Sequence, residues 1–61
     1  MTTYKITFAN VLDACTFADI AHVHTSDIYE KTVCLRNAKG SVSELSANLV
    51  KDGFVGFSVE A

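Results

Sequence analysis

The sequence predicts a small α+β domain with the element order β-α-β-β-α-β. The expected architecture is an open-faced sandwich, with two helices on one face of a small antiparallel sheet. Three observations support this prediction. Residues 3–8 alternate strictly between apolar and polar side chains, and residues 54–59 alternate again. Between them, residues 13–24 and 42–51 repeat apolar side chains at helical spacing.

Length and composition limit both the number of domains and the classes of ligand. A chain of 61 residues forms one domain, residues 1–61, and a domain of this size buries only about 60% of its unfolded surface. The formal net charge is −2 without a basic stripe, so nucleic acid is not an expected partner. No apolar run approaches the roughly 20 residues of a membrane span, so no membrane contact is expected. The N-terminus carries no secretory signal, and we therefore expect a cytoplasmic protein with two free thiols, Cys15 and Cys34.

The two alternating segments are expected to be strands with one buried face. The inward side chains are Tyr4, Ile6 and Phe8 in residues 3–8, and Val55, Phe57 and Val59 in residues 54–59. Polar residues between them indicate a second face that meets water. Gly56 interrupts the closing strand, which suggests a bulge or a close backbone approach.

The first predicted helix covers residues 13–24 and is capped by Asn10 or Asp13. Its buried stripe consists of Phe17, Ile20, Ala21 and His24, widened by Ala14 and Ala18. His22 is expected on the surface and His24 half-buried. Two residues apart on a helix they point about 200° away from each other, so they cannot share a metal ion.

Residues 27–30 and 33–37 are expected to form a hairpin of two short strands, with the turn at Glu30–Lys31–Thr32. One continuous strand is the alternative. The expected inward side chains are Tyr29, Val33 and Leu35.

The second predicted helix, residues 42–51, has clear start and stop signals. Ser41 and Glu44 have the spacing of a capping box, and Gly53 is a natural C-terminal stop. Apolar residues recur behind the cap at Val42, Leu45, Leu49 and Val50.

Four local strings, taken in order, resemble a known family. They are Val11-Leu12-Asp13-Ala14-Cys15-Thr16-Phe17, Ser26-Asp27-Ile28, Ala38-Lys39 followed by Ser41, and Leu49-Val50-Lys51-Asp52-Gly53. The family is HPr, the small histidine phosphocarrier of the sugar phosphotransferase system, whose first helix opens with Gly-Leu-His-Ala-Arg-Pro-Ala. The resemblance covers nearly the whole chain but not the C-terminal helix of the family, and it implies the strand order of the HPr fold.

The resemblance also implies that the phosphocarrier site is degenerate. Asp13, Cys15 and Thr16 stand where the family has its histidine, arginine and proline. The family's reaction needs a nucleophilic imidazole nitrogen and positive charge around the phosphoryl oxygens. Because both are replaced, we expect no enzyme, no metal and no cofactor. An acyl phosphate on Asp13 is the enzymatic alternative.

The same resemblance suggests a binding or regulatory role with a protein partner. Ser41 or Ser43 stands where the family carries its regulatory phosphoserine, and Val42, Leu45 and Ser46 stand near its partner-docking patch. The main prediction is therefore a non-catalytic HPr-like module. The alternative is an unrelated small α+β interaction protein, either inhibitory or a homodimer held together by an exposed apolar patch. A strand order other than that of HPr would favour the alternative.

Overall fold

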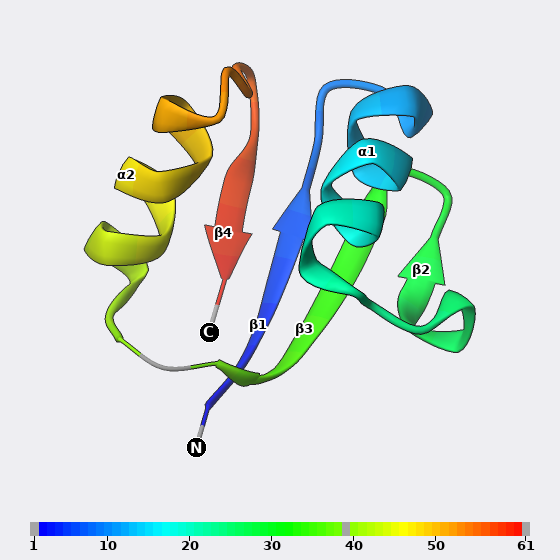
Figure 1. Ribbon diagram of the computed structural model, residues 1–61, viewed down its shortest axis with the longest axis horizontal. Helices are drawn as coiled ribbons and strands as arrows, with labels where there is room; N and C mark the ends of the chain where they lie inside the picture. The colour runs from blue at the N-terminus through cyan, green and yellow to red at the C-terminus, as the bar shows by residue number, and fades with distance from the viewer. Residues whose placement is uncertain (1, 39, 61) are drawn as a thin grey trace.

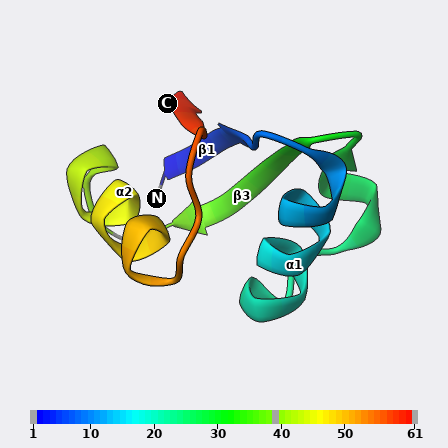
Figure 2. The ribbon, with the colours of Figure 1, turned by 90° about the horizontal axis from the view of Figure 1, so that it is seen from above.

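The computed structural model describes residues 2–38 and 40–60. Its elements, in chain order, are β1 (Thr2–Thr7), α1 (Val11–Ala21), the short 3-10 helix η1 (Thr25–Asp27), β2 (Ile28–Tyr29), β3 (Thr32–Ala38), α2 (Val42–Lys51) and β4 (Ser58–Glu60) (Figure 1). Both helices lie on the same face of the sheet (Figure 2). The predicted α+β open-faced sandwich is therefore confirmed.

The sheet is antiparallel, with strand order β2-β3-β1-β4. β1 and β2 run parallel to each other on the two sides of β3, while β3 and β4 run parallel on the two sides of β1. The chain thus forms two interlocked split β-α-β units, the ferredoxin-like arrangement. The HPr resemblance stays a prediction.

The register of the sheet decides which residues enter the core. One row across the four strands consists of Ile28, Val33, Ile6 and Val59. Ile6 and Val33 in this row are fully buried beneath the helices. The neighbouring row consists of Tyr29, Thr32, Thr7 and Ser58. Because side chains alternate along a strand, this second row lies on the helix-free face, where the hydroxyl oxygens of Thr7 and Thr32 are 3.3 Å apart.

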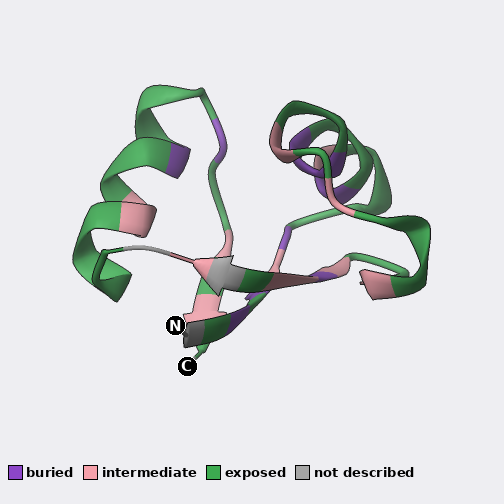
Figure 3. Cartoon of the chain, turned by 60° about the horizontal axis from the view of Figure 1, so that its bottom comes forward, coloured by how far each residue is buried: buried purple, intermediate pink, exposed green. Residues whose placement is uncertain are grey.

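Three phenylalanines fill the space between the sheet and the two helices. Phe8 lies 5.3 Å from Phe17 and 5.2 Å from Phe54, measured between ring centroids. Tyr4, Ile6 and Phe8 are all buried, as the alternation in residues 3–8 predicts. On α2 the buried residue is Leu49, whereas α1 contributes Ala14, Phe17 and Ala18 (Figure 3).

The first helix starts and ends earlier than predicted. Asn10 is the N-cap, because its side-chain oxygen accepts a 2.8 Å hydrogen bond from the backbone N–H of Asp13. The helix ends at Ala21 because His22 adopts a left-handed conformation with φ of 56°. His24 therefore lies outside the helix and is exposed, so its predicted half-buried position is wrong.

Ile20 is also placed wrongly by the predicted stripe, since 55% of it is exposed. The helix rotates about 100° per residue, so Ile20 lies on the flank of Phe17 opposite Ala14 and Ala18. Those two small residues face the sheet and bring the helix close to it, and Ile20 is left in solvent.

The hairpin prediction is confirmed, and the alternative of one continuous strand is wrong. β2 and β3 flank a turn at Glu30 and Lys31, with Glu30 in the left-handed region at φ of 55°. Tyr29, predicted to point inward, is 60% exposed. The two-residue turn pairs Tyr29 with Thr32 and Ile28 with Val33, so Ile28 takes the inward position instead.

The second helix has the predicted bounds, and the closing strand is shorter than predicted. Gly56 has φ of 68°, and a Cβ there would lie 3.3 Å from the Cβ of Ala9, so the predicted close approach at this glycine is confirmed. The positive φ interrupts the alternation. Val55, predicted inward, is consequently 72% exposed, and β4 begins only at Ser58.

Candidate functional site

The three degenerate phosphocarrier-site positions lie in the first turns of α1 but do not converge. Asp13 and Cys15 point about 200° apart around the helix axis. Asp13 is half-buried, whereas Cys15 and Thr16 are exposed. The hydroxyl of Thr16 donates a 2.9 Å hydrogen bond to the backbone carbonyl of Leu12, within the helix itself. The three side chains therefore do not form one anion-binding or catalytic cluster.

The two candidate regulatory serines lie at the opposite end of the sheet. β1 and β3 are antiparallel, so α1 starts at one end and α2 at the other (Figure 1). Ser41 is the N-cap of α2, and its hydroxyl accepts a 3.2 Å hydrogen bond from the backbone N–H of Glu44. Ser41 and Ser43 are both exposed. Phosphorylation at either serine stays a prediction.

The predicted partner surface on α2 faces partly inward. Leu45 is half-buried and packs against the core, and Ser46 is also half-buried. Val42 is 37% exposed. These residues lie on the side of the helix that also carries buried Leu49, so they offer little area to a partner.

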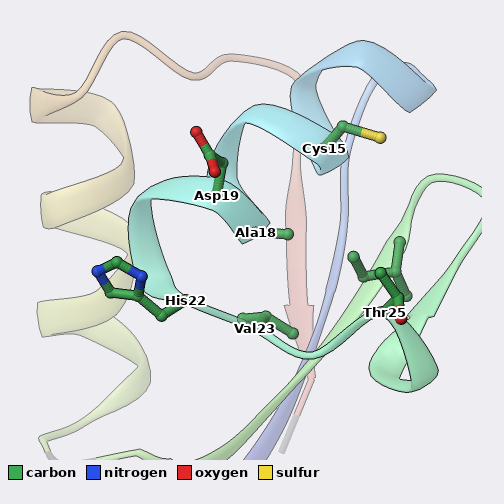
Figure 4. Close-up of a pocket in the computed structure, with 7 residues that line it drawn as sticks. Cys15, Ala18, Asp19, His22, Val23 and Thr25 are labelled. Carbon is green, nitrogen blue, oxygen red and sulfur yellow. The ribbon is translucent and has the colours of Figure 1, made fainter.

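A shallow hollow of about 330 Å³ lies beside α1 (Figure 4). Its lining residues are Cys15, Ala18, Asp19, His22, Val23, Thr25 and Ile28. The thiol of Cys15 and the imidazole of His22 point away from each other in this view, so they do not form a nucleophile–base pair. Within residues 2–38 and 40–60, no three His, Cys, Asp or Glu side chains are grouped so that they could hold a metal ion.

A second hollow, of about 250 Å³, lies next to the first and contains the ion pair of the described chain. The Nε–H of Arg36 donates a 3.0 Å hydrogen bond to Oδ1 of Asp27. This hydrogen bond, together with the negative charge of Asp27, raises the pKa of the Arg36 guanidinium above its usual value. Nearby, Nδ1 of His24 accepts a 3.2 Å hydrogen bond from the backbone N–H of Ser26. These contacts tie η1 to β3 and to the loop that precedes it.

The clearest surface feature is one that the sequence patterns did not indicate. Among the described residues, seven large hydrophobic side chains are exposed, and five of them belong to segments at the end of the sheet where β1 finishes. These five are Val11, Leu12, Tyr29, Val50 and Val55. We call this surface the apolar end; Figure 2 views the molecule from that side.

The topology explains why these five residues lie at the same end of the sheet. α1 starts where β1 ends, which places Val11 and Leu12 there. The hairpin turn after Tyr29 lies at the same end, because Thr32 pairs with Thr7 and the N–H of Phe8 bonds to the carbonyl of Lys31. α2 runs back from the other end, so its last turn and the loop into β4 bring Val50 and Val55 there as well.

Charged residues of both signs belong to the segments of the apolar end. They are Asp13, Glu30, Lys31, Lys51 and Asp52, which belong to the same end segments of the chain. None of them forms an ion pair with another described residue. This end therefore combines exposed apolar area with charged groups that have no ionic partner among residues 2–38 and 40–60.

Comparison with protein-family models, with curated proteins and with solved structures finds no match for this chain. None of the helices in the described part of the chain is both long and apolar enough to cross a bilayer.

Proposed function

We propose that this chain is a non-catalytic protein-binding module and that the apolar end is its contact surface. The observation that carries the proposal is the exposure of Leu12 and Val55, at 74% and 72%, beside the other apolar side chains of the same end. Single exposed hydrophobic residues are normal on protein surfaces. A cluster with a charged rim is typical of a surface that binds another protein.

The arrangement of polar groups supports binding rather than catalysis. Asp13, the alternative phosphate acceptor, and Ser41, a candidate phosphoserine, lie at opposite ends of the sheet, and the Ser41 hydroxyl caps α2. Both hollows beside α1 are shallow, and no polar side-chain atom of the described residues is buried without a partner. Perturbed and unpartnered groups are the usual mark of a catalytic site.

The location of the exposed apolar residues favours the form of this proposal that does not depend on the HPr family. An HPr-like regulatory module would keep its docking patch around the start of α2, where Leu45 packs against the core. The exposed apolar area instead lies at the opposite end of the sheet. We therefore propose a small α+β interaction protein that binds through the apolar end and not through the start of α2.

Site-specific photo-crosslinking tests the proposal. A photoreactive side chain is placed at position 12, inside the apolar end, or at position 43, an exposed position at the other end. In cells that produce the chain, we expect position 12 to give a discrete protein adduct, position 43 to give none, and Val55→Asp to remove the adduct at position 12. Equal labelling from both positions, or no protein adduct from position 12, would contradict the proposal.

A further inference from the structure

We infer that the partner of the apolar end is a second copy of this chain, bound through a two-fold axis. This inference rests on the proposed function and names the partner of that same surface. In a two-fold contact the same patch is presented by both copies, so a patch must be complementary to itself. The apolar end meets this requirement in both its apolar area and its charges.

The charge pattern is the first argument. Lys31 and Lys51 lie at the same end as Asp13, Glu30 and Asp52, and none of the five is ion-paired within the described chain. A strongly acidic or strongly basic partner would meet like charges on part of this rim, which costs affinity. A second copy presents both signs, so the lysines of one copy can approach the carboxylates of the other.

The apolar area is the second argument. Leu12 and Val55 are more than 70% exposed, and Val11, Tyr29 and Val50 are more than half exposed. A 61-residue domain has a limited core, and small domains often gain the missing burial through a second subunit. Association of two apolar ends removes part of this apolar area from water.

The size of the surface sets the expected strength of the dimer. A standard interface takes about 800 Å² from each partner, which is about a fifth of the 4119 Å² accessible here. The whole molecule spans only 24 × 23 × 18 Å across its Cα atoms, so a contact confined to one end is small by that standard. We therefore expect a weak dimer that forms and dissociates with concentration rather than an obligate one.

Sedimentation equilibrium of the whole chain, from about 10 µM to about 1 mM, tests the inference. We expect the average mass to rise from 6.6 kDa towards twice that value. Leu12→Asp and Val55→Asp should each abolish the rise, and Lys51→Glu should weaken association several-fold. Ile20→Asp is the matched control, because Ile20 is a similarly exposed apolar residue towards the other end of α1, and it should leave the rise unchanged. Circular dichroism verifies that each variant is folded.

The outcomes separate this inference from the proposed function. A wild-type chain that stays monomeric at about 1 mM overturns the second-copy inference, and so does a dimer that Ile20→Asp disrupts as strongly as Leu12→Asp. In either case, a site-specific adduct between position 12 and a different protein would still support a binding module. Absence of both the dimer and the adduct would overturn the two proposals together.

Discussion

The two ends of the sheet differ in the side chains that they present to solvent. At the end where β1 begins, the Tyr4 hydroxyl donates a 2.9 Å hydrogen bond to the carbonyl of Gly40, Ser41 caps α2, and Arg36 pairs with Asp27. At the apolar end the backbone is also satisfied, by the Asn10 cap and the bond from Phe8 to Lys31, but large apolar side chains remain in solvent. Hydrogen bonds and an ion pair within the chain need no partner, whereas exposed apolar area becomes stabilising only when another molecule covers it.

The largest expected effect on stability comes from removing an aromatic ring from the core between the helices and the sheet. Phe17 is 6% exposed and packs on Phe8 and Phe54. Phe17→Ala should therefore lower the free energy of unfolding by about 3–5 kcal/mol, measured by denaturant titration. A change of this size is a large part of the stability of so small a domain.

The control for this substitution is Ile20→Ala on the same helix. Because Ile20 is mostly exposed, we expect its replacement to change the free energy of unfolding by less than about 0.5 kcal/mol. Equal effects of the two substitutions would mean that α1 packs through a different face, and that Ile20 is not a solvent-exposed control for the apolar end.

A smaller effect is expected from loss of the α2 cap, at the end of the sheet where β1 begins. We call this the polar end, because Tyr4, Arg36 and Ser41 make its hydrogen bonds. Ser41→Ala removes the acceptor for the backbone N–H of Glu44 and should cost about 1 kcal/mol. Ser43→Ala is the matched control, since Ser43 is exposed inside the first turn and no cap depends on it. A stabilising effect of Ser41→Ala would show that the Ser41 hydroxyl does not cap α2 in the way the structure indicates.

The sequence predicted elements well where a local signal determines the structure. The bounds of α2 follow from the Ser41–Glu44 spacing and from Gly53, and both signals act within a few residues. The hairpin and the buried face of β1 were also predictable from local patterns. α1 was harder, because two good caps, Asn10 and Asp13, compete at its start, and a left-handed histidine ends it without any glycine.

Features that depend on register or topology could not be predicted from local patterns. Tyr29 and Val55 were expected inward, and their exposure follows from the hairpin register and from the positive φ at Gly56. The degenerate phosphocarrier-site positions were assigned from a string that resembles HPr, and that resemblance stays a prediction. The apolar end exists only because antiparallel pairing brings three distant segments to one end of the sheet, so no single stretch of sequence indicates it.

The smallest expected effect is that of the Arg36–Asp27 ion pair, which also lies towards the polar end. Arg36 is exposed, so solvent and salt screen its attraction to Asp27, and Arg36→Gln should leave the melting temperature unchanged at physiological salt.

The pKa of Arg36 is raised by Asp27, so any stabilisation by this charge is complete below the usual arginine pKa and is lost only as pH rises above it. Between about pH 6 and pH 9, the melting temperatures of the wild type and of Arg36→Gln should therefore depend on pH in the same way. If this substitution instead lowered the melting temperature as much as Ser41→Ala, the end where β1 begins would depend on charge as well as on hydrogen bonds, and high salt would destabilise it.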